Sequence, residues 1–409
     1  MTISPPYNVK IINDTDSSIK ILASGFDRLI LAVDVKWNDE SFFEYLKGLK
    51  EKAKENNRET IGLIGKEENT EWYFNMNQSG SKGWEWVLKG QEFTLIIGNW
   101  LTPISRPSIM IDIGSETLWR VGPREAVEWI MNLIRSVGGE IISVKPSRVD
   151  LCVDVLMPDE LWTDDLKRYR VTRARKFHPY FEDDRLTGMM IGKGGISARL
   201  YDKVFEIERQ SKKYWMFDIW KLEEIPEGMK VIRIEFQLRR EVIREVAIDT
   251  IDDLFKYPDN LWAYCTKNWL KFQDMPGKHH TQRETLNWWK EIQNGFMGVQ
   301  DAVPIIRNKA LRIEEEALRN QALGYLTSLV ALEMEEMGLN IPHRINFKEA
   351  ILSIINSSER IGKDDNDFMD EVQRKRIKYH RSMAKMEQVR ERRSELGFPI
   401  GNIDAKRIN

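Results

Sequence analysis

The sequence of 409 residues contains little cysteine and no long apolar run. Its two cysteines, Cys152 and Cys265, are too few for a disulfide framework and have apolar or aromatic neighbours, so we expect inert core thiols and a reducing compartment. The N-terminal stretch MTISPPYNVK lacks the apolar region of a signal peptide, and no apolar segment is long enough to span a bilayer. These absences predict a cytoplasmic protein with no membrane partner.

The sequence also lacks an excess of charge of either sign. Sixty-two Lys and Arg residues balance 64 Asp and Glu residues, for a net charge of -2, which argues against a uniformly basic coat for nucleic acid. Contact with a polyanion would therefore require local patches, and two basic patches occur, at 167–176 and 372–393. The cations of the first patch are Lys167, Arg168, Arg170, Arg173, Arg175 and Lys176. The second patch is equally compatible with a solvated helix face.

The length and the apolar pattern predict more than one domain. The chain is longer than a single hydrophobic core usually supports, and 42% of its residues are hydrophobic. Alternating apolar residues predict strands at 27–35, 92–98, 109–113, 147–155, 186–191, 196–202 and 231–239, and helices are expected at 39–55 and 123–137. We expect a flexible N-terminus at 1–20, an α+β domain at 21–295, and a helical C-terminal domain with a basic tail at 296–409.

An internal similarity bears on the fold. The segments RLILAVDV (28–35) and RVDLCVDV (148–155) agree at five of eight positions, which predicts two related α/β halves in one mainly antiparallel sheet. The two copies differ where the first has Ile30 and the second has Asp150. Only the second copy therefore places a carboxylate at this position of the apolar strand.

Three predicted strands are apolar on one side and charged on the other, because alternate side chains share a face of a strand. The hairpin 186–203, which turns through GKGG at 192–195, contributes Arg199, Tyr201 and Lys203 to a charged face. The other two strands contribute Arg148, Asp150, Cys152 and Asp154, and Arg233, Glu235, Gln237 and Arg239. If the strands are neighbours, these side chains lie on one surface.

Two interpretations of this charged surface remain open from the pattern alone. Asp150, Asp154 and Glu235 could converge to hold a hard divalent cation through oxygen ligands. Alternatively, the sheet has one solvated face on which the arginines at 148, 233 and 239 pair with the acids across strands.

Three segments, in this order, resemble the replication initiation factor family: SRVDLCVDV, TGMMIGKGGISARLYDKVFE and VIRIEFQLRR. The family comprises rolling-circle plasmid initiators of the staphylococcal type, related phage initiators, and relaxases of some integrative conjugative elements. Its motifs are an Arg-x-Asp-x-x-x-Asp strand, a glycine hairpin ending in Tyr-Asp-Lys, and an Arg-x-Glu strand. The segment TLNWW at 285–289 resembles the end of the family, so the resemblance covers 20–295.

The resemblance implies an enzyme that nicks one strand of DNA. Tyr201 would attack a phosphodiester, remain joined to the 5′ phosphate and free a 3′ hydroxyl. A phenol is a weak nucleophile at neutral pH, so Lys203, Arg199 and a bound Mg²⁺ or Mn²⁺ would favour the phenolate and neutralise the phosphate. Tyr180 and Tyr214 are rival nucleophiles outside the Tyr-Asp-Lys context.

The metal ligands implied by the matching strands are Asp150, Asp154 and Glu235. A carboxylate site is the consistent expectation because the chain lacks the His-hydrophobic-His motif of the better-known rolling-circle nickases. We expect DNA contacts from the patch at 167–176 and from Arg233 and Arg239.

The expected partners are duplex origin DNA, the nicked single strand and, because no ATP-binding motif is evident, a host helicase. A homodimer is a further option. A relaxase with the same chemistry and a non-catalytic DNA-binding protein of the same fold are the alternative functions.

Overall fold

The computed structural model describes residues 19–57, 60–67, 70–274, 283–309, 315–336, 348, 351–352 and 364–401. The chain divides into one unit that ends at Arg307 and a second that begins at Asn308. Most of the segment expected to be a flexible N-terminus lies outside the described residues.

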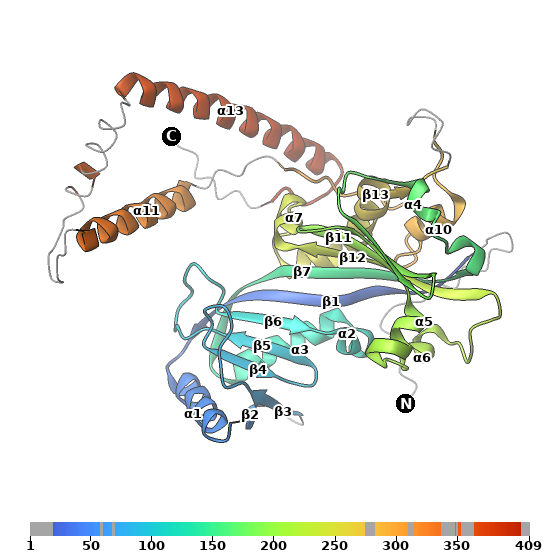
Figure 1. Cartoon of the computed structure of the whole chain (residues 1–409). Helices are drawn as coiled ribbons and strands as arrows, with labels where there is room; N and C mark the ends of the chain where they lie inside the picture. Colours follow the sequence, from blue (N-terminus) through green and yellow to red (C-terminus); the bar gives the residue numbers. More distant parts are fainter. Residues whose placement is uncertain are drawn as a thin grey trace. The chain divides into compact units, whose positions relative to one another are not determined.

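The first unit is built on a large antiparallel sheet. Its described residues form 11 strands in the order β2-β3-β4-β5-β6-β1-β7-β12-β11-β10-β9. The long strands β1 and β7 lie side by side in its middle (Figure 1). The strands are β1 (Lys20–Trp37), β2 (Thr60–Glu67), β3 (Thr70–Met76), β4 (Trp86–Lys89), β5 (Phe93–Ile97), β6 (Ile109–Ile113), β7 (Gly139–Pro158), β9 (Phe177–Glu182), β10 (Arg185–Gly192), β11 (Ile196–Asp202) and β12 (Met229–Arg239). This architecture confirms the predicted α+β class.

The sheet consists of two related halves, as the internal similarity predicted. In each half the last strand returns to pair with the first, so β6 pairs with β1 and β12 pairs with β7. The halves join where β1 and β7 pair, and Leu29 lies opposite Val149, its equivalent in the repeated segment. The local twofold axis that relates the two halves therefore passes between Leu29 and Val149.

Helices cover one face of the sheet and enclose the main core. Ile134 of α3 (Pro123–Ser136) lies over Val35, and the ring of Phe236 meets that of Trp262 of α9 (Pro258–Ala263) with centroids 5.3 Å apart. Val35 and Phe236 each belong to a run of apolar residues that alternate along their strands. The burial of these two runs drives the packing of the helices on this face. The other helices of the layer are α1 (Ser41–Glu55), α7 (Arg240–Glu245), α8 (Ile251–Lys256) and α10 (Asn287–Asn294).

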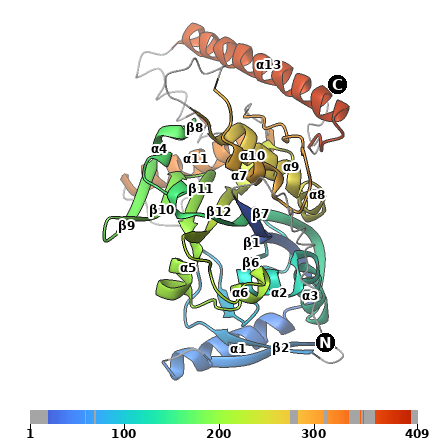
Figure 2. The same cartoon turned by 90° about the vertical axis from the view of Figure 1, so that its right-hand side faces the viewer.

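The opposite face of the sheet is covered at one end only. A second apolar cluster joins Trp119 of α2 (Ser115–Val121) to Cys152 of β7 and to Met216 and Trp220 of α6 (Met216–Trp220). The chain reaches α6 from β11 through α5 (Lys203–Glu206) and the π-helical segment η2 (Ile207–Ser211). Figure 2 shows α5 and α6 beside the ends of β12 and β1. The cluster borders the charged face described below.

Residues 283–307 complete the first unit. A small sheet pairs β8 (Arg170–Thr172) with β13 (Leu270–Phe272), and Phe272 packs on Trp289. Phe296 stacks on Trp262 at 5.2 Å, and Ile305 is fully buried. The segment that follows 295 thus packs on the sheet unit, so the boundary expected at 295 lies at 307.

Three short elements complete the first unit. The 3-10 turn Asp159–Leu161 and α4 (Leu166–Tyr169) lie between β7 and β9, and the π-helical segment η3 (Tyr264–Trp269) follows α9.

The described part of the second unit is helical. It contains α11 (Glu315–Glu336) and α13 (Asp365–Glu395), which begins with a capping box between Asp364 and Asp367. The basic patch 372–393 lies on α13. None of the described helices combines the length and apolarity needed to cross a membrane.

The core packing predicts the cost of removing Trp289. This side chain is fully buried, and its indole nitrogen donates to the carbonyl of Thr266 at 3.1 Å. We expect Trp289→Ala to lower the free energy of unfolding by about 3–5 kcal/mol, because it leaves a large cavity; the Thr266 carbonyl still accepts from Gln293 Nε2 at 2.9 Å. Urea denaturation of the isolated protein measures the change. Tyr214→Ala, at a position 55% exposed, should change it by less than about 0.5 kcal/mol, and equal losses would contradict the prediction.

Candidate active site

Strands β7, β12 and β11 are neighbours, so their charged side chains share a surface. The cross-strand register places Arg199 opposite Glu235, and Tyr201 opposite Arg233. Glu235 in turn lies opposite Cys152, and Arg233 lies opposite Asp154. Directly opposed residues point to the same side of a sheet. The face expected from alternation is therefore present, although most of it is buried rather than solvated.

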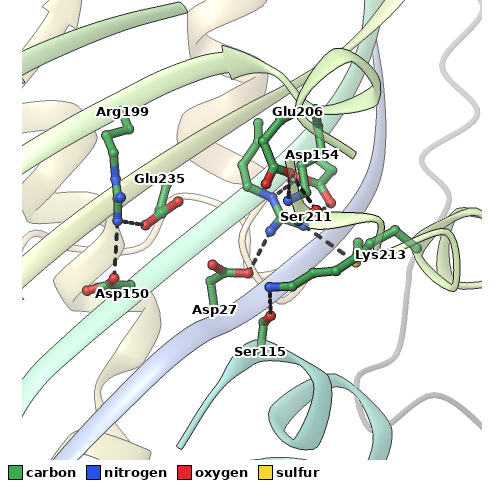
Figure 3. A network of polar contacts seen from close by, with 12 residues as sticks. Asp27, Ser115, Asp150, Asp154, Arg199, Glu206, Ser211, Lys213 and Glu235 are labelled. Carbon is green, nitrogen blue, oxygen red and sulfur yellow. Dashed lines mark hydrogen bonds and ion pairs between the residues drawn. The ribbon is translucent and has the colours of Figure 1, made fainter. Parts of the chain in front are cut away.

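A chain of hydrogen bonds links Tyr201 to two carboxylates. The Tyr201 hydroxyl donates to Glu235 Oε2 at 3.2 Å, and Arg199 Nη2 donates to Glu235 Oε1 and, at 3.3 Å, to Asp150 Oδ2. Figure 3 shows Arg199 between the two acids. The Arg199 side chain is 42% exposed, whereas those of Asp150 and Glu235 are 1% and 3% exposed. A solvent-accessible guanidinium thus lies above two buried carboxylates, next to a phenol.

Burial sets the protonation of this group. The pKa of Tyr201 is raised well above 10, first by desolvation and then by the neighbouring Glu235 charge. Desolvation, together with the charge of Asp27, also raises the pKa of Glu235 to about 7. Tyr201 is therefore a neutral phenol at neutral pH, and Glu235 is poised to accept its proton. The positive charge of Arg233 favours the phenolate, but the effect of burial on the Tyr201 pKa is larger.

Lys203 lies beside Tyr201 but is directed to another acid. Its ammonium is 5.6 Å from the centre of the Tyr201 ring and donates to Glu206 Oε2 at 2.5 Å. Burial and the Arg233 charge lower the pKa of Lys203. Lys203 thus adds positive charge near the ring without bonding the hydroxyl.

A second group of charges includes Asp27 and Asp154, which Figure 3 labels apart from Asp150 and Glu235, and it is centred on Arg233. Its Nε and Nη2 donate to Asp154 at 2.6 and 2.7 Å, and its Nη1 donates to Asp27 at 2.6 Å. The indole of Trp220 also donates to Asp154, at 2.8 Å. Arg233 is only 1% exposed, so the predicted DNA contact at this residue is wrong. Asp154 is held by Arg233 and Trp220, apart from the pair formed by Asp150 and Glu235.

Asp27 is a site residue that the sequence patterns did not single out. Alternation from Leu29 would place Asp27 on the helix-covered face. A bulge between Phe26 and Arg28 instead turns Phe26 toward α8 and Asp27 toward Arg233. Burial tends to raise the pKa of Asp27, but the charges of Arg233, Lys203, Lys213 and Arg199 outweigh it and lower the pKa.

The expected metal ligands are not gathered into one site. Within the described ranges, no group of three or more His, Cys, Asp or Glu side chains is placed to hold a metal ion. Each of the three predicted ligands instead accepts hydrogen bonds from an arginine: Asp150 from Arg148, Asp154 from Arg233, and Glu235 from Arg199. Arginines thus pair with the acids, as the second interpretation predicted, but the partner of Glu235 is Arg199, and Arg148 bonds an acid of its own strand rather than one across strands. The requirement for Mg²⁺ or Mn²⁺ stays a prediction, and no ligand set for it follows from this arrangement.

The remaining predicted DNA contacts lie near the edge strand β9 or at a strand end. Arg173, Arg175 and Lys176 are exposed in the segment that leads into β9, and Arg239 is exposed at the end of β12. Lys167 and Arg168 pair with the adjacent acids Asp164 and Asp165, and Arg170 lies 4.0 Å over the ring of Phe177. Of the rival nucleophiles, Tyr214 lies outside the face described above and Tyr180 lies on β9.

The first half of the sheet lacks this site. The twofold relation makes Met110, Ile96 and Gly98 the equivalents of Glu235, Arg199 and Tyr201, because they occupy the same registers relative to β1. One charged pair of this half is Arg28 of β1 with Asp112 of β6. The phenol and its carboxylate partner therefore occur in one half only.

Comparisons with known proteins find a likeness to solved structures but none in sequence. No family model matches the chain, and no curated protein matches its sequence. Among solved structures, the rolling circle replication initiator protein from Geobacillus stearothermophilus is similar, with a TM-score of 0.40 and 14% identity. The likeness covers 69% of this chain and 98% of that one. We base the proposed function on the residues and contacts of this chain.

The arginine forks predict a large stability effect at Arg233 and a small one at Arg28. Arg233→Ala would leave Asp154, which is fully buried, without its counter-charge, so we expect a loss of about 3–5 kcal/mol in the free energy of unfolding. Arg28→Ala removes a partly exposed pair with Asp112 and should cost about 0–1 kcal/mol. Urea denaturation compares the two variants, and a similar cost for both would refute the distinction.

Proposed function

We propose that this chain is a DNA-nicking enzyme that initiates rolling-circle replication, with Tyr201 as its nucleophile. The observation that carries the proposal is the hydrogen bond from the Tyr201 hydroxyl to Glu235, with the guanidinium of Arg199 beside the same carboxylate. A nucleophile, a proton acceptor and a cation thus meet on one surface, which is the set needed for attack on a phosphodiester. The Tyr-Asp-Lys context of Tyr201 agrees with this role.

In the proposed reaction, the Tyr201 oxygen attacks phosphorus while Glu235 takes the phenolic proton. The bond from phosphorus to the 3′ oxygen breaks, so the 5′ phosphate becomes joined to Tyr201 and the 3′ oxygen leaves as a hydroxyl after gaining a proton from water. Because the pKa of Tyr201 is raised, the phenol needs a base rather than spontaneous ionisation. The reaction exchanges one phosphoester for another, so the reverse attack can reseal the strand.

Arg199 and Lys203 supply the positive charge in this scheme. The Arg199 guanidinium is partly exposed and can contact a non-bridging phosphate oxygen while it stays bonded to Glu235. Lys203 is buried beside the Tyr201 ring and stabilises the charge that develops on the phenolic oxygen. The hairpin GKGG is a tight turn in which Gly192 and Gly194 have positive φ. Because the sequence shows no ATP-binding motif, duplex unwinding is assigned to a partner helicase.

A nicking assay tests the nucleophile. The substrate is a supercoiled plasmid carrying the DNA that flanks the coding sequence, incubated with protein and Mg²⁺ or Mn²⁺. We expect a nicked circle with protein joined to the 5′ end, and loss of both products in Tyr201→Phe. Tyr214→Phe, a matched change at an exposed tyrosine, should keep both. Nicking that survives in Tyr201→Phe would move the nucleophile elsewhere, and full activity in chelator would remove the metal requirement.

The role of Glu235 predicts the pH dependence of nicking. A base must be deprotonated, so we expect the single-turnover rate to rise with pH through about 7, the pKa of Glu235, and then to level off. Glu235→Gln should lower the rate by a factor of about 100 or more and remove this rise. Glu44→Gln, at an exposed position on α1, serves as the matched control. An unchanged pH profile in Glu235→Gln would assign proton transfer to another group.

A further inference from the structure

The edge strand β9 presents a second tyrosine on the same face as Tyr201. Tyr180 lies opposite Gly188 of β10, and Gly188 lies opposite Tyr201 of β11. Side chains at directly opposed positions share a face, so Tyr180 and Tyr201 point to one side of the sheet, two strands apart. At the usual strand spacing their backbones are about 10 Å apart.

No side chain stands between the two tyrosines in this row, because the position between them is glycine. A Cβ at Gly188 would lie 3.0 Å from the Cβ of Tyr201, so any larger residue would crowd the nucleophile. In the neighbouring row, His178 lies opposite Met190, which lies opposite Arg199. The ring of His178 meets that of Tyr180 edge to face at 5.8 Å. The edge strand thus carries a paired aromatic surface beside the site.

This surface is exposed and has positive charge at one end. Tyr180 is 47% exposed, and Arg173, Arg175 and Lys176 precede β9 with no ion-pair partner among the described residues. The other end of β9 is acidic, with Glu182 followed by Asp183 and Asp184. Binding of a polyanion is therefore favoured near the first residues of β9 and disfavoured near the last residues of β9.

We propose that Tyr180 and His178 form a stacking platform for an unpaired base of the DNA strand that Tyr201 attacks, with Arg173, Arg175 and Lys176 holding its backbone. This inference rests on the proposed function and names a binding site for the substrate strand. The combination of exposed aromatic rings with a basic segment is the one that binds single strands, because every base has a face to stack on. A duplex would not offer an unpaired base, so the occupant is single-stranded DNA.

The edge strand supplies its own matched control. Phe181 follows Tyr180, is 50% exposed, and lies opposite Leu186, a residue only 7% exposed. Adjacent residues of β9 point to opposite faces, and a bulge between Leu186 and Gly188 accommodates the extra residue of β10. Phe181 is therefore an equally exposed aromatic residue that faces away from Tyr201. If any exposed aromatic ring bound DNA, the loss of either Tyr180 or Phe181 would weaken binding. The platform includes Tyr180 but not Phe181.

Binding is measured by fluorescence anisotropy with a labelled oligothymidine of about 20 nucleotides at low salt, a length that covers the site size of a single-strand groove. The protein carries Tyr201→Phe, so no cleavage is needed and the result does not depend on nicking. We expect Tyr180→Ala to raise Kd about 10-fold, in the range usual for loss of one stacked base. Binding should recover in Tyr180→Phe, which keeps the ring, and Phe181→Ala should bind as the parent does.

Photocrosslinking locates the base directly. Oligothymidine that contains 5-iodouracil, irradiated in complex with the same protein, should become joined to the peptide that holds His178 and Tyr180. The inference is overturned if the parent does not bind oligothymidine, if Tyr180→Ala binds as the parent does, if Phe181→Ala loses as much affinity, or if the crosslink lies elsewhere. The plasmid nicking assay judges the proposed function separately, because a protein without this platform can still nick through Tyr201.

Discussion

The structure of the charged face depends on one interaction, the buried fork between Arg233 and Asp154. Charges at the centre of a sheet are costly unless each one is paired and hydrogen-bonded. Arg233 meets this condition with Asp154 on one side and Asp27 on the other, and the indole of Trp220 completes the partners of Asp154. The fork thereby joins β1, β7, β12 and α6, and Tyr201 of β11 lies directly opposite Arg233.

Burial of the charged face costs free energy, and it also sets the pKa values on which the proposed proton transfer depends. Removing water raises the pKa of the Tyr201 phenol and the pKa of the Glu235 carboxyl together. The phenol then needs a base, and the raised pKa of Glu235 makes it one that can take a proton near neutral pH. Arg199 reaches from the buried pair to solvent, so a phosphate would meet its charge first.

The two halves of the sheet show how one framework supports different surfaces. Both place a long first strand beside a returning last strand, and both bury alternating apolar residues under helices on the same face. The opposite faces differ because Glu235, Arg199 and Tyr201 replace the apolar or small residues Met110, Ile96 and Gly98. The site is thus a change of side chains on a repeated backbone.

The sequence by itself determined seven strands of the sheet but not β2, β3, β4 or β9. It also determined the helical C-terminal region and the side of the sheet on which Asp150, Tyr201 and Glu235 lie, because alternation has a period of two and identifies a face directly. Only the tertiary structure decided which charges meet. Register and twist set lateral distances, so they separated Asp154 from Glu235 and paired it with Arg233. A bulge, which alternation cannot reveal, brought Asp27 into the site. Burial likewise follows from the packing of α2 and α6, and it converted an expected solvated face into a set of enclosed ion pairs.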